Sequence, residues 1–132
     1  MPHSRIRVKD AAALLGVSDD TVRRWIDSGA VPAEKDDAGR KVIDGADLAR
    51  FARANASPPP DPTGTESSAR NRLVGLVTKV TSDLVMSEVE MQCGPFTIVS
   101  LMSTESVRTL GLEPGSIAVA VVKATTVIVE AS

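Results

Sequence analysis

Apolar positions in the first half of the chain recur with the spacing of α-helices. One predicted helix covers 8–15 and ends at Gly16, a suitable C-cap, and a second begins after Ser18, a suitable N-cap. Their apolar faces hold Val8, Ala11, Ala12 and Leu15 in the first helix, and Val22, Trp25 and Ile26 in the second. Two helices joined by so short a turn predict a helix-turn-helix.

A polar stretch follows these helices and predicts a β-hairpin, or wing. Residues 34–41 are polar, with Gly39 near the tip, and Val42 and Ile43 form the returning strand. Asp44 then caps a short third helix, which turns Leu48 and Phe51 toward the core. The first half is therefore predicted to be a mainly α-helical winged helix-turn-helix.

The second half contains short β-rich runs separated by turns. The predicted strands cover 73–80, 84–91, 96–101, 117–122 and 126–130. Ser103 caps a short helix that ends at Leu110 and Gly111. Five strands and one helix predict an all-β, OB-like barrel, so the whole chain is predicted to be an α+β protein of two domains.

Residues 56–67 separate the two halves. This segment holds four prolines, one glycine and no large apolar side chain, so it favours extended polyproline II geometry rather than a packed structure. At ~3.1 Å per residue it can span up to roughly 35 Å. We therefore expect three parts: a winged helix-turn-helix at 1–55, a linker at 56–67 and a barrel at 68–132.

Composition narrows the function classes. The chain has 132 residues, 42% of them hydrophobic and 24% charged, with a net charge of −2. No apolar run has the length of a membrane span, and a lone cysteine, Cys93, gives no reason to expect a location outside the cytoplasm. The single histidine, His3, is expected in a frayed terminus, and no nucleophile–base pair or metal-spaced ligand set is evident. We therefore expect a cytoplasmic binding protein without membrane contact and not an enzyme.

Arginines gather in the first half, where 1–55 holds ten Lys and Arg against nine Asp and Glu. The order helix, turn, helix, wing, helix in RVKDAAALLGVSDDTVRRWIDSGAVPA and RKVIDGADLARFA resembles the MerR-like and excisionase-like winged helix-turn-helix family. The resemblance implies that the second helix enters the major groove of double-stranded DNA and that the wing touches the backbone or minor groove. It makes these residues candidate DNA contacts: Thr21, Arg23 and Arg24 on the helix, and Arg40 and Lys41 on the wing. The alternative is a solvated helix face with no ligand.

Two polar segments interrupt the strand pattern of the second half. They are Ser67-Ser68-Ala69-Arg70-Asn71 and Lys123-Ala124-Thr125-Thr126. Each combines hydroxyl groups, backbone N–H groups beside a small alanine, and one cation. Several donors of this kind suit a tetrahedral oxyanion, which has four acceptor oxygens. The alternative is that Arg70 and Lys123 are ordinary surface charges next to turns.

The same segments carry a second resemblance. SARN, VGLVTKVTSDLVMSEVEM and VSLMSTESVRTLGLEPGSIAVAVVKATTVIVE resemble the molbindin (Mop, or TOBE) family of molybdate-binding domains. The resemblance implies that molybdate or tungstate binds between subunits, held by the first segment of one subunit and the second segment of another, and that no side chain ligates molybdenum directly. One wall of this site would be formed by Ser68, Ala69, Arg70 and Asn71. If the motif is shifted by one residue, this wall would begin at Ser67. The other wall would be formed by Lys123, Ala124 and Thr125.

Together the two halves predict a molybdate- or tungstate-responsive DNA-binding transcription regulator. Residues 56–67 cannot form a dimerisation helix, so a homo-oligomer has to form through the second half. The alternative hypothesis is a molybdate-storing or buffering protein without a specific operator. Protection of a defined DNA site distinguishes the regulator from the store.

Overall fold

The computed structural model describes residues 4–132, so the predicted frayed terminus at His3 lies outside the described residues. The chain divides between Ser57 and Pro58 into two compact units, each with its own core. Within 4–132 no helix combines the length and apolar character needed to cross a membrane.

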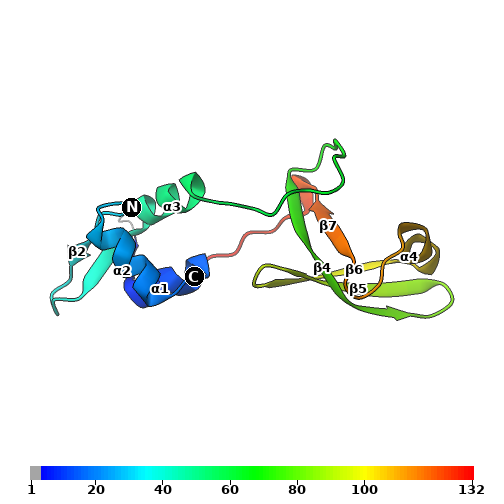
Figure 1. Ribbon diagram of the computed structural model, residues 1–132, viewed down its shortest axis with the longest axis horizontal. Helices are drawn as coiled ribbons and strands as arrows, with labels where there is room; N and C mark the ends of the chain where they lie inside the picture. Colours follow the sequence, from blue (N-terminus) through cyan, green and yellow to red (C-terminus); the bar gives the residue numbers. More distant parts are fainter. Residues whose placement is uncertain (1–3) are drawn as a thin grey trace. The chain divides into compact units, whose positions relative to one another are not determined.

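The first unit has the helix-turn-helix and wing that the sequence predicts. Its elements are β1 (Arg5–Arg7), α1 (Val8–Leu15), α2 (Asp19–Asp27), β2 (Glu34–Lys35), β3 (Lys41–Asp44) and α3 (Gly45–Ala54) (Figure 1). Gly16 ends α1 with a left-handed φ of 67°, a conformation that costs glycine little. The Ser18 side chain accepts a hydrogen bond from the N–H of Thr21 at 3.1 Å and so caps α2. Both predicted caps are confirmed.

The strand β1 was not predicted from the sequence. It pairs antiparallel with β3, placing Arg7 opposite Val42, and β2 pairs with the other side of β3. A strand of three residues is too short to show a hydrophobic alternation. The pairing matters because it fixes Arg7 beside the wing.

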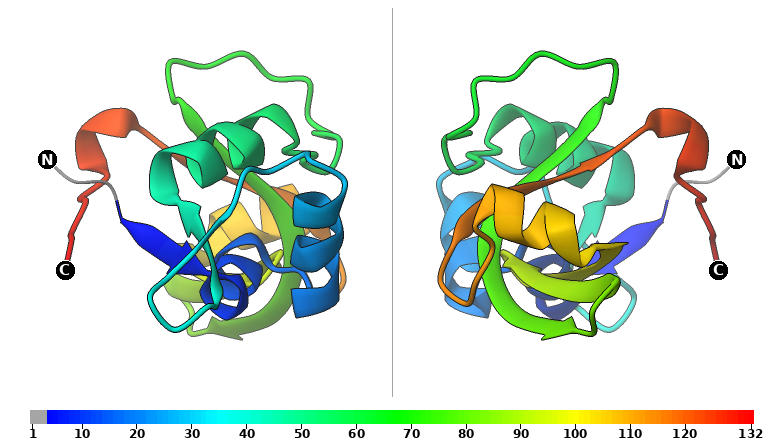
Figure 2. Two further views of the ribbon diagram at one scale, coloured as in Figure 1. Left: turned by 90° about the vertical axis from the view of Figure 1, so that its left-hand side faces the viewer. Right: turned by 90° about the vertical axis from the view of Figure 1, so that its right-hand side faces the viewer.

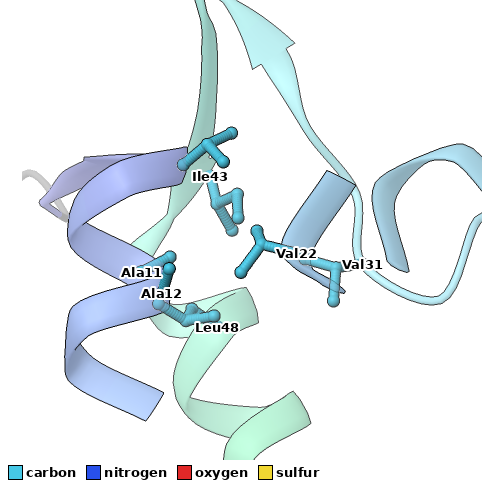
Figure 3. Close-up of a cluster of buried hydrophobic side chains, with 7 residues drawn as sticks. Ala11, Ala12, Val22, Val31, Ile43 and Leu48 are labelled. Atoms are coloured by element: carbon cyan, nitrogen blue, oxygen red, sulfur yellow. The ribbon is translucent and has the colours of Figure 1, made fainter. Parts of the chain in front are cut away.

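The core of the first unit lies between the helices and β3. Figure 3 shows side chains from all three helices, together with Ile43 of β3, meeting in one cluster. Ile43 and Val22 are fully buried. The half-buried ring of Trp25 packs against Phe51, with ring centroids 4.7 Å apart, which confirms that Trp25 belongs to the core.

The second unit is a curled antiparallel sheet. Its elements are β4 (Asn71–Ser82), β5 (Met86–Cys93), β6 (Phe96–Ser103), α4 (Thr104–Leu110), β7 (Ile117–Val122) and a 3-10 turn, η1 (Ala124–Thr126). The strand order is β6-β5-β4-β7. In Figure 2, β4 bends along its length and α4 lies at one end of the sheet, where it contacts β5 and β6. Ser103 caps α4 as predicted, and Gly111 ends it.

The prediction of a closed five-stranded barrel is wrong for the single chain. Residues 126–130 form no strand, because η1 turns the chain after β7 and no edge of the sheet pairs with the residues that follow. The sheet is therefore a half-barrel of four strands with one short helix. The β-branched residues of this segment, Thr126 to Val129, are typical of a strand, but a strand also needs a neighbour to pair with.

Residues 56–67 contain no helix or strand, yet part of this segment is tied to the second unit. The guanidinium of Arg72 donates to the Asp61 carboxylate and to the Thr63 hydroxyl, both at 2.8 Å. The bond from Arg72, together with hydrogen bonds that the hydroxyl and N–H groups of Thr63 donate to the same carboxylate, holds the pKa of Asp61 well below its usual value. The contact therefore stabilises the folded chain above the usual carboxyl pKa and is lost as the pH falls through the lowered one.

Gly75 of β4 has no room for a side chain. A Cβ at this position would lie 2.3 Å from the Gln92 carbonyl oxygen and 2.7 Å from Cys93 Sγ. We expect Gly75→Ala to lower the free energy of unfolding by about 1–3 kcal/mol, because the backbone of β5 must shift. Urea unfolding measures the effect, with Lys79→Ala on the same strand as the control. Equal stability of the two variants would contradict the close packing at Gly75.

Candidate functional sites

A basic cavity lies where α1, α2 and the wing meet. Its volume is about 240 Å³, and its lining residues are Arg7, Val8, Lys9, Asp19, Arg23, Arg40 and Lys41. Five cations against one carboxylate form a strongly positive surface in a unit whose net charge is nearly zero. The arrangement suits a polyanion with regularly spaced charges, such as a nucleic-acid backbone.

The cations of this cavity make only weak contacts with nearby carboxylates. Arg23 lies 3.3 Å from Asp20, and its side chain is about half exposed. Lys41 Nζ lies 3.2 Å from Asp27, which links the wing to the end of α2. Exposed ion pairs contribute little stability, about 0–1 kcal/mol. A phosphate can therefore replace these carboxylates at low cost.

Asp36 shapes the turn of the wing. Its carboxylate accepts hydrogen bonds from the N–H groups of Arg40, at 2.8 Å, and Ala38, at 3.0 Å. The bond from Arg40 N–H is the main cause that holds the pKa of Asp36 below its usual value. Gly39 completes the turn with a φ of 78°. The carboxylate therefore stays ionised at neutral pH and holds the backbone that carries Arg40.

The structure brings together three of the five predicted DNA contacts: Arg23, Arg40 and Lys41 line the cavity. Thr21 and Arg24 do not line it. The half-buried Thr21 hydroxyl lies 2.9 Å from Ser18 Oγ and accepts from Arg24 Nη2 at 3.1 Å.

Sequence reasoning missed Arg7 and Lys9, which line the same cavity. The basic run Arg7-Val8-Lys9 before the first helix is visible in the sequence. Its position beside the wing follows from the β1–β3 pairing, which the hydrophobic pattern does not reveal.

Replacing Arg7 tests whether this cavity faces a phosphate backbone. We expect Arg7→Ala to weaken binding to all duplex sequences alike. The slope of log affinity against log salt concentration should become shallower by about 1, because one phosphate contact is lost. Fluorescence anisotropy at several salt concentrations measures both effects. Arg53→Ala, in the last turn of α3 and outside the cavity lining, is the matched control. An unchanged slope in Arg7→Ala would place the phosphate contacts elsewhere.

The two polar segments of the second unit meet at one end of its sheet. Asn71, the first residue of β4, lies opposite Val122, the last of β7, and its side-chain amide donates to the Val122 carbonyl at 3.0 Å. Segments 67–71 and 123–125 of one chain are therefore neighbours. We call them together the donor cluster.

Local hydrogen bonds fix the backbone of the donor cluster. Ser67 Oγ accepts from the N–H of Ala69 at 3.2 Å. Lys123 precedes η1, and its carbonyl accepts from the Thr126 hydroxyl at 2.8 Å. The first N–H groups of such a turn have no acceptor inside it, so those of Ala124 and Thr125 can donate to a ligand.

The two cations of the donor cluster are unpaired within residues 4–132, since neither Arg70 nor Lys123 lies within ion-pair distance of a carboxylate there. Only Ala69 and Asn71 are half-buried, and the other residues of the cluster are exposed. One chain therefore presents these donors on an open surface. A second surface has to cover them before water is excluded from a bound anion.

Metal ligation and thiol chemistry find no support in the described part of the chain. Residues 4–132 hold no group of three or more His, Cys, Asp or Glu side chains that could bind a metal ion. Cys93 is buried, with Sγ 3.7 Å from the Leu73 carbonyl oxygen, and burial raises the pKa of its thiol. A buried, protonated thiol is a poor nucleophile.

Two family models match separate parts of the chain. Residues 6–56 match a helix-turn-helix domain, and residues 67–129 match a TOBE domain. The first match covers α1, α2, the wing and α3, and the second covers the half-barrel and the whole donor cluster. No curated protein matches the chain significantly.

Several solved structures are similar to about half of the chain. A molybdate-binding protein from Sporomusa ovata is 31% identical over 51% of this chain and 100% of its own, with a TM-score of 0.49. MopII from Clostridium pasteurianum is 39% identical over 50% of this chain and 100% of its own, with a TM-score of 0.47. The cytoplasmic molybdate-binding protein ModG, with molybdate bound, is 40% identical over 48% of this chain and 46% of its own, with a TM-score of 0.45.

Proposed function

We propose that this chain, which joins a helix-turn-helix domain to a TOBE domain, is a molybdate-responsive DNA-binding transcription regulator. The observation that carries the proposal is the presence of two anion-directed surfaces in one chain. The basic cavity suits a phosphate backbone, and the donor cluster suits a small oxyanion. A regulator of this kind acts in the cytoplasm, where its DNA is.

The first unit binds double-stranded DNA through α2 and the wing. The resemblance to MerR-like and excisionase-like proteins supports a position of α2 in the major groove, with Thr21, Arg23 and Arg24 toward the bases. Arginine suits this role because its planar fork can donate two hydrogen bonds to guanine or to a phosphate. Arg40 and Lys41 contact the backbone from the wing.

The donor cluster binds molybdate or tungstate. Both ions are doubly charged and carry no proton at neutral pH, so a site built from donors alone suits them. Lys123 and Arg70 supply positive charge, and Ser68 and Thr125 supply hydroxyl donors. Phosphate keeps a proton part of the time and is best bound beside a carboxylate that can accept this proton in a hydrogen bond, and segments 67–71 and 123–125 contain no carboxylate. Sulfate has the right charge and is excluded by its smaller size.

A homo-oligomer completes this site. The donor cluster is open on one side in a single chain, so a second copy has to cover it. Among residues 4–132, fourteen large apolar side chains are exposed, and thirteen of them belong to the second unit, Leu14 being the exception. Monomeric proteins rarely expose so much apolar surface in one region. The second unit is therefore the oligomerisation domain.

A storage protein without a specific operator is the second candidate. It is favoured by Asp19, which lies in the basic cavity, and by the near-balanced charge of 1–55. A carboxylate there repels phosphate and weakens non-specific DNA binding. Selection of duplexes from a random library separates the candidates, because a regulator enriches one sequence and a store enriches none.

Titration calorimetry of the full chain tests the oxyanion assignment. We expect heat and saturation with molybdate and tungstate, and at most weak binding of sulfate and phosphate at the same concentrations. Equal affinity for all four ions would show that the donor cluster recognises charge alone, and absence of molybdate binding would overturn the proposal.

A further inference from the structure

One arginine fastens part of the proline-rich segment to the second unit. Arg72 of β4 donates from Nε to the Asp61 carboxylate and from Nη2 to the Thr63 hydroxyl, both at 2.8 Å. Thr63 donates its N–H and its hydroxyl to the same carboxylate, at 2.9 and 2.7 Å. We call these three residues the clamp. Of the ion pairs formed among residues 4–132, Arg72–Asp61 is the one in which both side chains are mostly shielded, at 24% and 33% exposed, so salt screens it least.

Apolar contacts hold the same segment against the half-barrel. Pro59 lies at a cavity of about 310 Å³ whose other walls include Leu76 of β4 and Ile117 of β7. Thr63 borders a second cavity, of about 350 Å³, that the core residue Val89 also lines. Proline loses little conformational freedom when it packs, because its φ is already fixed. Residues 58–63 are therefore a docked strap of the second unit and not free linker.

The clamp encloses the first segment of the donor cluster. Arg72 and Asp61 are eleven residues apart in the sequence, and segment 67–71 lies between them, in the loop at the start of β4 (Figure 1). Because both ends of this loop are fixed, the segment has fewer conformations than it has in an open chain. A ligand that binds 67–71 in one geometry therefore favours the closed clamp. The closed clamp favours the ligand by the same factor, since linked equilibria are reciprocal.

The clamp also sets the length of the free linker. When it is closed, only residues 55–57 lie between α3 and the second unit, a span of roughly 9 Å at ~3.1 Å per residue. When it is open, the free chain extends to residue 66, a span of roughly 37 Å. The difference is roughly 28 Å in each copy, close to the ~34 Å of one turn of DNA. Opening of the clamp therefore extends the reach of the first unit by almost one helical turn.

We propose that the clamp transmits oxyanion occupancy to the first unit. A bound oxyanion keeps the strap docked and the linker short, so that the DNA-binding units of one oligomer reach only half-sites at a closely defined separation. Arg72 is then a positioning residue for segment 67–71, and it also determines the separation of the half-sites. The inference rests on the proposed function and identifies how its two sites communicate.

Asp61→Ala separates the effect of the clamp from simple electrostatics. Electrostatics alone predicts tighter molybdate binding in this variant, because a carboxylate is lost from a unit with excess negative charge and the Arg72 guanidinium is freed. The clamp predicts the opposite. Calorimetry of the full-length variant should show molybdate binding at least about fivefold weaker, a typical lower value for the coupling of two linked equilibria.

Glu66→Ala is the matched control for this measurement. It removes a carboxylate from the same loop, and Glu66 makes no ion pair or hydrogen bond within residues 4–132. This variant should bind molybdate at least as tightly as the wild type. Molybdate affinity in Asp61→Ala equal to or above that of the wild type would overturn the proposal.

Closure of the clamp can be measured without any ligand. The Thr63 N–H is bonded to Asp61, so its hydrogen exchange in the full chain, followed by NMR, reports the docked strap. Arg72→Ala should speed this exchange at least about tenfold, and Lys79→Ala, at an exposed site of the same strand, should leave it unchanged. Molybdate should slow it further in the wild type. Equal exchange in Arg72→Ala and the wild type would show that the strap is not docked.

Duplexes with two selected half-sites at varied separation test the linker length. With molybdate, the wild type should bind one separation at least about tenfold more tightly than a separation one turn longer, whereas Asp61→Ala should bind both within about threefold. The same preference in both proteins contradicts the proposal. If the wild type binds molybdate and DNA but Asp61→Ala behaves like the wild type, only this inference fails. If the clamp closes but the wild type binds neither ligand, the proposed function fails.

Discussion

The double variant Ser68→Ala/Lys123→Ala should bind molybdate at least about a hundredfold more weakly than the wild type, which corresponds to ~2.7 kcal/mol. In the proposed site Lys123 provides an ammonium group for a dianion, and a hydrogen bond to a charged group contributes about 1.5–3 kcal/mol. Ser68 adds a hydroxyl donor from the other segment of the donor cluster, for which about 1 kcal/mol is typical. Titration calorimetry of the folded full-length variant measures the loss.

Single variants resolve the contributions within the donor cluster. Lys123→Ala alone should lower molybdate affinity by about tenfold to a hundredfold, and Thr125→Val should cost less because one donor is lost while the shape is kept. Arg70→Ala shows whether this guanidinium contacts the ligand or only positions β4. Lys79→Ala removes an exposed cation of β4 outside the cluster and is the control. Undiminished binding in the folded double variant would place the oxyanion elsewhere.

The double variant Arg23→Ala/Arg40→Ala should lose about a hundredfold or more in affinity for a selected DNA site. A side chain that contacts a base edge contributes about 1–3 kcal/mol of discrimination. The charge-assisted phosphate contact that we propose for Arg40 would add about 1.5 kcal/mol or more. Both residues line one cavity, so their effects need not be additive. Fluorescence anisotropy on a duplex selected from a random library measures the change.

The single variants Arg23→Ala and Arg40→Ala should affect different properties of DNA binding. Arg23→Ala should alter the preferred sequence, because we propose that Arg23 contacts bases, whereas Arg40→Ala should weaken every sequence to the same extent. Circular dichroism confirms that each variant is folded. If Arg23→Ala and Arg24→Ala both keep the affinity and the preference of the wild type, α2 is not the helix that reads the DNA.

Features encoded by neighbouring residues could be predicted from the sequence. Ser18, Asp44 and Ser103 cap helices, and Gly16 ends one, because capping depends on bonds between residues at most a few positions apart. The strand β1 could not be predicted in this way. Its three residues form a strand only because β3, far along the chain, pairs with them.

In the candidate sites, too, residues placed by local sequence could be predicted, whereas those placed by pairing between distant strands could not. Arg23 and Arg40 could be assigned from the helix and wing pattern, but the contribution of Arg7 depends on the register of β1 against β3. In the second unit, the contact of Asn71 with Val122 joins residues 51 positions apart, and no local pattern indicates it. The resemblance to molbindin proteins identified segments 67–71 and 123–125 as candidates. That they are neighbours within one chain follows only from the pairing of β4 with β7.

The affinity of the full chain for a selected DNA site, measured with and without saturating molybdate, tests the central claim most directly. Coupling between two ligands typically amounts to about 1–3 kcal/mol, so we expect molybdate to change the DNA dissociation constant by about 5- to 150-fold. Sulfate at the same concentration should leave the constant unchanged. If calorimetry shows that molybdate is bound while the DNA affinity stays the same, or if no DNA sequence is selected at all, the chain is a molybdate store and not a regulator.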